Sequence, residues 1–176
     1  MKITSPDELK RLVRDVPDFP KKGIVFKDIT PVLKNPDALQ FAVDELAEFL
    51  APFGPDQIAG IESRGFILSP ILAYKLKVGF VPVRKRGKLP WETIRVSYEL
   101  EYGEAELEIH QDAILKGMKV AVVDDLLATG GTAQAAIQLV EKLGGKVVAV
   151  GFLVELAFLK GRERLAGYNV FSLIRY

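Results

Sequence analysis

Two adjacent aspartates, Asp124 and Asp125, follow four apolar residues and precede a loop of small residues. The loop, residues 128–132, reads Ala-Thr-Gly-Gly-Thr and leads into a segment with helical periodicity. A carboxylate pair can accept hydrogen bonds from the two hydroxyls of a sugar diol. A glycine-rich loop at the start of a helix presents backbone N–H groups that bind a phosphate monoester. A sugar phosphorylated at its 5-position offers both groups, so this segment predicts a ligand of that class.

A simpler interpretation of the same residues is a capped helix, in which one acid caps and the glycines only turn the chain. A lone aspartate would favour that interpretation. Two successive acids after an apolar run favour a binding site, because each buried carboxylate needs a partner to offset its desolvation. The motif is neither a Walker loop, since no lysine follows the glycines, nor a dinucleotide fingerprint, since the glycine spacing differs.

Composition limits the classes of protein to consider. The 176 residues fit a single domain, 1–176, and carry 24 basic against 23 acidic side chains, so no strong field favours nucleic acid or anionic membrane. The absence of cysteine excludes disulfides, thiolate catalysis and sulfur-ligated metals, and the single histidine, His110, excludes a multi-histidine metal site. The first ten residues are polar and no apolar run approaches the roughly 18 residues of a membrane span, so a cytoplasmic protein is expected.

The N-terminal part of the chain predicts helices around an irregular segment. A helix should begin at Ser5-Pro6, where a cap residue is followed by a glutamate three positions on, and should end near Val16-Pro17. Residues 18–34 combine proline and glycine with a few apolar side chains, which predicts an irregular, partly buried segment. Asn35-Pro36 should open a second helix.

Beyond this part, apolar runs and helical periodicity predict that strands and helices alternate. The expected strands are 57–61, 79–83, 119–123 and 146–154, and the expected helices are 65–75 and 131–143. Such alternation predicts an α/β fold with a parallel sheet covered by helices on both faces. Ligands of these sheets bind at the carboxyl ends of the strands, which is where Asp124 and Asp125 fall.

One hairpin interrupts the alternation. Apolar residues at every second position over 94–100 and 105–109 predict two antiparallel strands inserted between parallel-sheet units. The approach to them, residues 84–92, holds four basic side chains with Gly87 and Pro90. A basic arm that leads into a hairpin predicts a flap, about 84–110, that closes over an anionic ligand. The alternative is a solvated loop.

Together these segments resemble a known family. Residues 120–132 are similar to the phosphoribosyl-diphosphate signature of the type I phosphoribosyltransferases. Further segments are similar to the adenine phosphoribosyltransferases: GIVFKDITP at 23–31, ESRGF at 62–66, the flap from 84–90 to 100–103, and LVEL at 153–156. The likeness covers nearly the whole chain from about residue 5. It implies an α/β fold with a parallel sheet flanked by helices, an inserted antiparallel hairpin flap and an N-terminal hood segment.

The resemblance implies a role for each candidate site residue. Asp124 and Asp125 would hold the ribose 2- and 3-hydroxyls, and the 5-phosphate would be bound by Ala128, Thr129, Gly130, Gly131 and Thr132. The diphosphate would be bound by Ser63, Arg64, Lys85 and Tyr102. Glu101 would be the catalytic acid, stabilising or shuttling a proton near N7 or N9 of adenine. From the residues alone, Arg64 could equally form a surface ion pair, and Glu101 could be an exposed turn residue.

The adenine site implied by the resemblance consists of Val25, Phe26, Lys27 and Leu156. Phe26 would stack on the purine and Leu156 would cover its other side, although the residues alone favour Phe26 as ordinary core. Mg²⁺ would arrive with the diphosphate, held by its oxygens and by the ribose hydroxyls, with few or no direct protein ligands. His110 is expected to face solvent and to have no catalytic role.

The implied activity is transfer of the 5-phosphoribosyl group from 5-phosphoribosyl 1-diphosphate to adenine, which gives AMP and diphosphate in purine salvage. The resemblance also implies a homodimer. The nearest alternative is a phosphoribosyltransferase that acts on another base, such as xanthine or orotate. A second alternative is a regulator that senses the phosphoribosyl ligand and binds DNA; such a protein should carry a DNA-binding segment and a basic surface, and these 176 residues offer neither.

Overall fold

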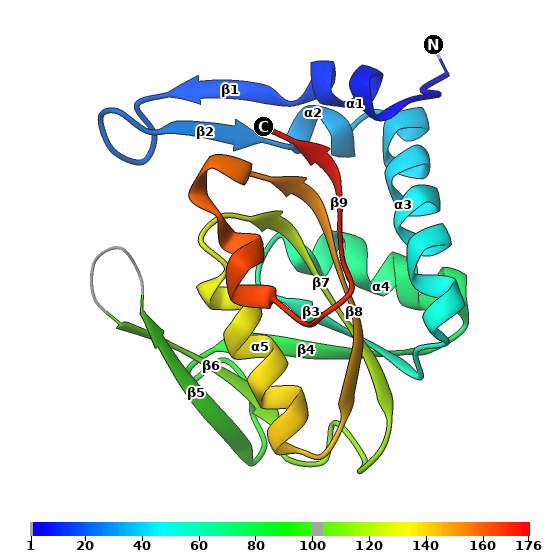
Figure 1. Cartoon of the computed structure of the whole chain (residues 1–176), viewed down its shortest axis with the longest axis vertical. Helices are drawn as coiled ribbons and strands as arrows, with labels where there is room; N and C mark the ends of the chain where they lie inside the picture. Colours follow the sequence, from blue (N-terminus) through cyan, green and yellow to red (C-terminus); the bar gives the residue numbers. More distant parts are fainter. Residues whose placement is uncertain (1, 100–103) are drawn as a thin grey trace. The chain divides into compact units, whose positions relative to one another are not determined.

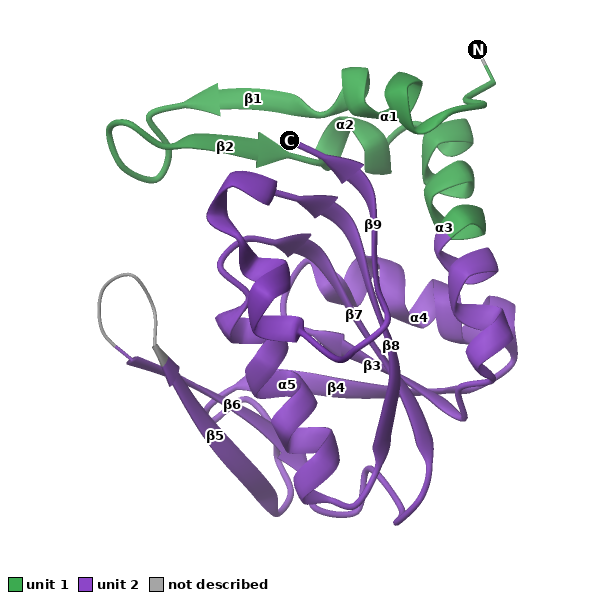
Figure 2. Ribbon diagram, in the orientation of Figure 1, with its two compact units in different colours: residues 1–45 green, residues 46–176 purple. Residues whose placement is uncertain are grey.

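The computed structural model describes residues 2–99 and 104–176, except for the side chain of Glu99. The chain divides into two compact units, Met1–Glu45 and Leu46–Tyr176 (Figure 2). The boundary between them falls inside helix α3. The single domain expected over residues 1–176 stays a prediction.

The first unit begins with helix α1, Pro6–Leu12, at the predicted start. Ser5 caps this helix, since its Oγ accepts a hydrogen bond from the N–H of Glu8 at 3.4 Å. The Glu8 carboxylate in turn accepts from the N–H of Thr4 at 2.8 Å. The expected end near Pro17 is wrong: the helix ends at Leu12, because Val13 is extended and leads the chain into a strand.

A two-stranded antiparallel sheet occupies part of the segment that was expected to be irregular. Strand β1, Arg14–Pro17, pairs with strand β2, Val25–Asp28. The short helix α2, Thr30–Leu33, follows, and the Asp28 carboxylate accepts from both the N–H and the hydroxyl of Thr30 at 2.9 Å. Four-residue strands next to prolines carry too little alternation to be recognised from the sequence.

Helix α3, Pro36–Leu50, begins where the sequence predicts. Its apolar residues Val43, Leu46 and Leu50 are buried, as their spacing along a helix predicts. Within the second unit, Leu46 and Leu50 lie beside Gly151, where an added Cβ would be 3.4 Å and 3.9 Å from their methyl groups.

The second unit is built on a seven-stranded sheet in the order β5-β6-β4-β3-β7-β8-β9 (Figure 1). Strands β4, β3, β7, β8 and β9 are parallel, whereas β6 pairs antiparallel with both β4 and β5. The bounds are β3 Gln57–Ile61, β4 Gly79–Lys85, β5 Thr93–Glu99, β6 Glu104–His110, β7 Lys119–Leu127, β8 Lys146–Glu155 and β9 Val170–Arg175. The parallel sheet with its inserted hairpin confirms the predicted fold class. Strand β9 is not predicted by the sequence.

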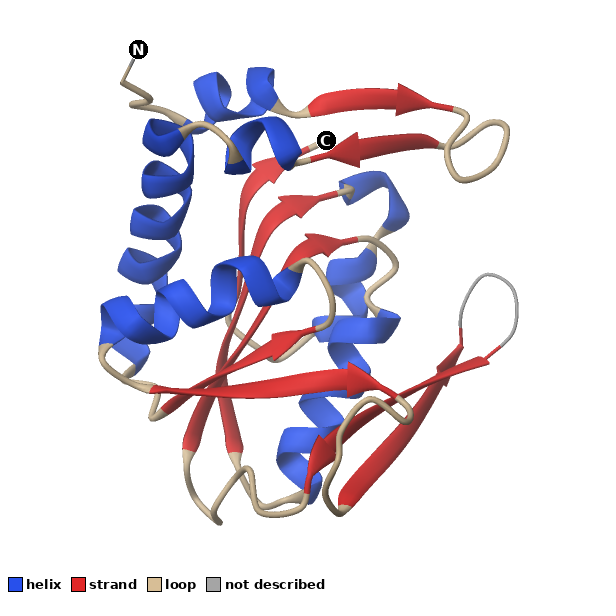
Figure 3. Ribbon diagram, turned by 180° about the vertical axis from the view of Figure 1, so that it is seen from behind, coloured by secondary structure: helices blue, strands red, loops and turns tan. Residues whose placement is uncertain are grey.

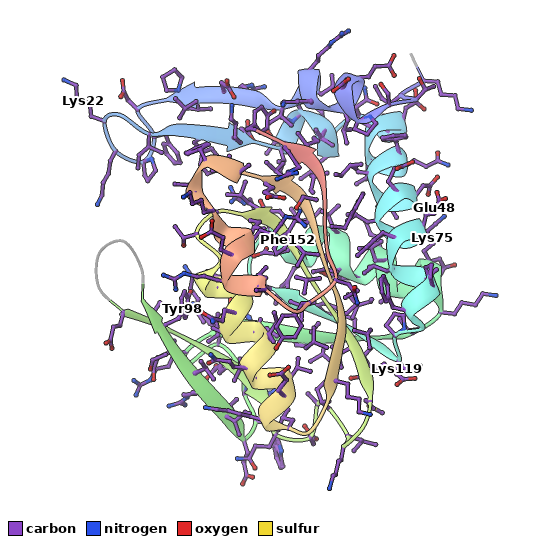
Figure 4. The ribbon with its side chains drawn as sticks, viewed as in Figure 1. Lys22, Glu48, Lys75, Tyr98, Lys119 and Phe152 are labelled. Atoms are coloured by element: carbon purple, nitrogen blue, oxygen red, sulfur yellow. The ribbon has the colours of Figure 1, made fainter. Side chains whose placement is uncertain are left out.

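Helices α4, Gly65–Leu76, and α5, Gly131–Lys142, cover opposite faces of this sheet (Figure 3). On the α4 face, Gly60 of β3 is so close to the helix that an added Cβ would be 2.6 Å from that of Ser69. On the α5 face, apolar residues of the helix and of the sheet form one core, which includes the fully buried Phe152 of β8 (Figure 4). Three 3-10 helices complete the unit: η1 Ala51–Phe53, η2 Ala157–Leu159 and η3 Gly161–Leu165.

Of the helices in the described part of the chain, none combines the length and the apolar character that crossing a membrane requires.

Candidate active site

The two aspartates lie on β7 just beyond the point where its neighbour β3 ends. Pairing of β7 with β3 stops at Val123, whereas pairing with β8 continues to Leu127. The strand therefore does not end at the acids, as the sequence predicted, because the ten-residue β8 keeps β7 extended to Leu127. Asp124 and Asp125 still lie at the carboxyl edge of the parallel sheet, where such sheets bind ligands.

The aspartate pair is buried and faces an arginine. Only 9% of Asp124 and 4% of Asp125 is exposed, and the N–H of Asp125 donates to the Oδ1 of Asp124 at 2.9 Å. The Nε of Arg64 lies 2.7 Å from the Oδ2 of Asp125. That oxygen is buried and accepts no well-directed hydrogen bond from the part of the chain that the structure describes, so the contact with Arg64 is an ion pair. Arg64 is therefore paired with the aspartates of the site itself.

The environment makes both carboxylates unusual. Burial raises the pKa of Asp124, and the neighbouring Asp125 carboxylate raises it further. Burial also raises the pKa of Asp125, although the Arg64 guanidinium partly offsets this effect. Perturbed pKa values at a sheet edge are typical of a functional site. A ligand that donates hydrogen bonds to these oxygens, as a diol does, would offset their desolvation.

Gly65, the first residue of α4, lies directly against Asp124. A Cβ at Gly65 would be 2.8 Å from the Asp124 Oδ1, so only glycine lets the helix begin this close to the carboxylate. The residue before it is Arg64, which the same packing brings to the aspartate pair. Ser63 precedes Arg64, is exposed, and follows a cis peptide bond from Glu62. In the sequence, the only sign that Gly65 has a special role is its position between Arg64 and an apolar helical segment.

The small-residue loop leaves the start of α5 open. Ala128 and Thr129 follow the strand, and Gly130 has a φ of 86°, a left-handed conformation that glycine adopts without steric cost. Among the described residues no side chain caps α5, and the N–H groups of its first turn, which begins at Gly131 and Thr132, lack partners within the helix. A phosphate could accept these hydrogen bonds and would be favoured by the helix dipole.

Gly161, which the sequence does not single out, supports this loop from η3. A Cβ at Gly161 would overlap the carbonyl oxygen of Ala128 and would lie 2.9 Å from the backbone nitrogen of Gly130. In the other direction, a Cβ at Gly130 would lie 2.5 Å from the carbonyl oxygen of Gly161. The two backbones are therefore packed together with no room for a side chain between them.

Glu62 connects the Ser63–Arg64 segment to the start of the basic arm. Its carboxylate accepts hydrogen bonds from the Nε and Nη2 of Arg84 at 3.0 Å and 3.3 Å, and from the backbone N–H of Lys85 at 3.2 Å. Burial would raise the pKa of Glu62, but the bonds from Arg84 and Lys85 outweigh burial and lower it. The Lys85 side chain is exposed at the end of β4, while its backbone is fixed beside the site.

A second acid, Glu108 of β6, holds the middle of the arm. Only 1% of Glu108 is exposed, and its Oε1 accepts from the N–H groups of Lys88 and Leu89, each at 2.9 Å. The Nε of Arg95 donates to the other oxygen at 3.3 Å. Burial would raise the pKa of Glu108, but these donors lower it. The alternating pattern of the hairpin places Glu108 on its polar side, so the sequence gives no sign that the residue is buried.

The position of His110 differs from the sequence-based expectation. The residue was expected to face solvent, but it is half-buried at the end of β6, and its Nε2 is buried without a hydrogen-bond partner among the described residues. A turn follows the strand directly, in which the N–H of Ala113 donates to the His110 carbonyl at 3.2 Å.

Comparison with known proteins identifies the family. The family model described as the phosphoribosyl transferase domain matches residues 32–174. The chain belongs to this family. Proteins named adenine phosphoribosyltransferase are 58% identical over 168 residues in Halothermothrix orenii and 57% identical over 169 residues in Thermotoga maritima. These alignments cover 96% of this chain in both cases, and 99% and 98% of the two relatives.

Solved structures of adenine phosphoribosyltransferases have the same fold. The crystal structure from Thermoanaerobacter pseudethanolicus has a TM-score of 0.95 at 56% identity and covers 98% of this chain and 100% of its own. The structure from Saccharomyces cerevisiae, complexed with an imino-altritol bisphosphate and adenine, has a TM-score of 0.89 at 45% identity and covers 96% and 97%. The resemblance noted in the sequence is thereby confirmed.

In this phosphoribosyltransferase the residues predicted to bind adenine fall in different units. Val25, Phe26 and Lys27 belong to β2 of the first unit. The Phe26 ring is half-buried and lies edge-on to Phe19, with centroids 5.2 Å apart, so it is not an ordinary core residue. Leu156 follows β8 in the second unit, where its N–H donates to the carbonyl of the last residue of β7 at 2.9 Å.

Two predicted residues of the phosphoribosyltransferase site, Glu101 and Tyr102, lie outside the described residues. Residues 2–99 and 104–176 contain no group of three or more histidine and acidic side chains that could hold a metal ion. The structure thus brings Arg64, Asp124 and Asp125 together, and the glycine-containing loop 128–132 follows at the end of the strand that carries the two aspartates.

Proposed function

We propose that this phosphoribosyltransferase transfers the 5-phosphoribosyl group from 5-phosphoribosyl 1-diphosphate to adenine, giving AMP and diphosphate for purine salvage. The observation that carries the proposal is the buried Asp124–Asp125 pair directly before an uncapped, glycine-rich helix start. The choice of adenine rests on the relatives, which bear the name adenine phosphoribosyltransferase at up to 58% identity over nearly their whole length.

The ribose 5-phosphate half of the substrate would be held by β7 and the loop after it. Asp124 and Asp125 accept hydrogen bonds from the 2- and 3-hydroxyls, which satisfies two carboxylates that burial otherwise disfavours. The 5-phosphate accepts from the backbone N–H groups at the start of α5, and the hydroxyls of Thr129 and Thr132 lie in the same segment. This arrangement fixes the anomeric carbon relative to the sheet edge.

The diphosphate leaves from that carbon, so cationic groups should lie beside it. Ser63 and Arg64 would bind it from the start of α4, and Lys85 and Tyr102 from the flap. Closure of the flap would keep bulk water from the electron-deficient sugar while the base attacks. The tie from Glu62 to the backbone of Lys85 supports this assignment, because it joins the flap base to the Ser63–Arg64 segment.

The base would be bound by Val25, Phe26, Lys27 and Leu156, with Phe26 stacked on the purine. The yeast relative was solved with adenine, which supports a purine site in this family. Glu101 would stabilise or transfer the proton of adenine as N9 attacks the anomeric carbon. A homodimer is expected from the family, and the cytoplasmic location stays a prediction.

Mg²⁺ would be held mainly by substrate oxygens. Hard cations prefer oxygen ligands, and the aspartate pair offers them, but Arg64 already neutralises part of its charge. The donor set therefore fits a cation that reaches the site with the diphosphate and has few direct protein ligands. When bound, it would neutralise the charge that develops on the departing diphosphate.

A panel of bases tests the proposal. The protein should be incubated with 5-phosphoribosyl 1-diphosphate, Mg²⁺ and, in turn, adenine, hypoxanthine, guanine, xanthine and orotate, and diphosphate release should be measured. Adenine should give the highest kcat/KM. A preference for xanthine or orotate would refute the assignment of the base while leaving the phosphoribosyl site intact, and no turnover with any base would refute the proposal as a whole.

A further inference from the structure

Glu155 is a buried acid at the end of β8 to which the proposed reaction assigns no role. Only 2% of it is exposed, and it lies opposite Leu127, the last residue of β7 before the phosphate-binding loop. A buried carboxylate is costly unless it is paired. Two arginines from later segments, Arg162 of η3 and Arg175 of β9, donate hydrogen bonds to it.

Arg162 makes the more extensive contact. Its Nε and Nη2 donate to the two Glu155 oxygens at 3.2 Å and 2.5 Å, a bidentate arrangement. The same guanidinium donates to the carbonyl of Val170 at 2.7 Å and to the Oγ of Ser172 at 3.3 Å, both on β9. Burial would raise the pKa of Glu155, but the hydrogen bonds from Arg162 and Ser172 and the charges of Arg162 and Arg175 together outweigh burial and lower the pKa. The charged pair therefore fixes η3 to the ends of two strands.

The residue before Arg162 is Gly161, whose backbone packs against Ala128 and Gly130 of the loop. The far end of η3 is held separately, because Leu165 is buried in the core. The end of η3 that touches the loop carries Arg162, whose guanidinium ties it to Glu155 and to β9. A small movement of Gly161 would change the surface on which the loop rests.

We propose that Glu155 and Arg162 are positioning residues for the 5-phosphate loop and act through the backbone of Gly161. The inference rests on the proposed function, because it takes residues 128–132 as the phosphate site. Loss of the Glu155–Arg162 pair should weaken binding of the 5-phosphate, because the pair positions the loop that binds this group. It should have little effect on the diphosphate, which Arg64 and Lys85 bind from another part of the sheet edge.

The test compares two ligands, one for the proposed 5-phosphate site and one for the proposed diphosphate site. AMP carries the 5-phosphate, and inorganic diphosphate does not. In the full-length Glu155→Gln variant the side-chain shape is kept, and the two arginines are exposed enough to be hydrated. Titration calorimetry with Mg²⁺ should show that the Kd for AMP rises about tenfold, the effect of losing roughly one hydrogen bond, whereas the Kd for diphosphate changes less than about twofold.

A second variant reaches the loop without breaking the pair. Gly161 does not have a positive φ, and the three atoms nearest to the new methyl group in Gly161→Ala all belong to the loop. This variant should show the same selective loss of AMP binding while Glu155 and Arg162 remain intact. It also keeps the inference testable if Glu155→Gln does not fold.

Tyr168→Phe is the matched control. It removes the hydrogen bond from the Tyr168 hydroxyl to Glu141 at 2.7 Å, which ties the segment after η3 to the far end of α5. Its urea midpoint should fall while AMP affinity stays unchanged. The inference is overturned if Glu155→Gln or Gly161→Ala binds AMP as tightly as the wild type, or if both ligands weaken equally. Failure of the wild type to bind AMP at all would instead overturn the proposed function.

Discussion

At the scale of single residues, the proposed ribose site depends on Gly65, which packs against Asp124. In Gly65→Ala the new Cβ would be 2.8 Å from the Asp124 Oδ1, so the carboxylate has to move. Displacing a group that orients the substrate by about 1 Å costs roughly a hundredfold in rate, so kcat/KM for 5-phosphoribosyl 1-diphosphate should fall by about that factor. Stability should fall as well, because the new Cβ would also lie 3.2 Å from the Asp124 Cα and from the Val123 carbonyl oxygen, which are backbone atoms of β7.

Gly79→Ala is the control for this prediction. The three atoms nearest to a Cβ there all belong to the Gln57 side chain, at 3.3–3.8 Å, and that long side chain can move aside. Its kcat/KM should match that of the wild type. Equal rates for Gly65→Ala and the wild type would show that the close packing of α4 on Asp124 does not orient the ribose.

The contrast between the aspartates and the glycines shows what a sequence can reveal of this site. Two adjacent acids after an apolar strand are visible because their cost of burial implies a partner. Gly65 and Gly161 are not visible, because what requires a glycine is a neighbour from a distant segment. The residues next to each glycine in the sequence do not show which distant segment packs against it. Only the three-dimensional arrangement of the strands and helices shows this.

At the scale of secondary structure, the basic arm is held by a charge that the sequence places on the surface. Glu108→Gln keeps the shape but removes the negative charge that Arg95 and the N–H groups of Lys88 and Leu89 face. Hydrogen bonds to a charged group contribute about 1.5–3 kcal/mol each, and the amide can replace only part of this, so the variant should unfold about 1–2 kcal/mol more easily at pH 7.

The pH dependence of that difference tests its cause. The folded state lowers the pKa of Glu108 below its ordinary value of 4.5, so the carboxylate stabilises the fold at pH values above 4.5. This stabilisation is lost as the pH falls through the lowered value. Urea unfolding of both proteins should therefore give a difference that is constant above about pH 5 and shrinks toward zero in stronger acid. A difference independent of pH would show that packing, and not charge, is what the substitution removes.

Elements with a regular pattern over five or more residues are those that the sequence predicts well. Strand β3, the β5–β6 hairpin and α5 lie close to their expected bounds, because alternation and helical spacing reflect burial on one face. The β1–β2 pair is missed because its strands have four residues each. The burial of Glu108 and Glu155 is not predicted, because a charged residue in a strand is expected to face solvent unless its partner is known. The partners of both residues come from other segments.

At the scale of the whole second unit, the core is apolar, and the buried acidic side chains lie towards the edges of the sheet. Asp124, Asp125 and Glu155 lie at the carboxyl ends of β7 and β8, and Glu108 lies beneath the arm. An apolar core stabilises the sheet, and the buried acids lie at the proposed ligand site or hold a segment next to it. Stability and function are therefore carried by different parts of the same strands.

Phe152 tests this division, because it has no exposed surface and lies opposite Asp124 in the β7–β8 register. Phe152→Ala should lower the free energy of unfolding by about 3–5 kcal/mol, since it removes buried surface and leaves a cavity. That is a large part of the 5–15 kcal/mol typical of a folded domain. The control is Phe158→Ala on η2, where 70% of the side chain is exposed and the change should stay within about 0.5 kcal/mol. Urea unfolding at a constant m-value measures both, and similar losses for the two variants would show that the core does not depend on the β8 aromatic side chain.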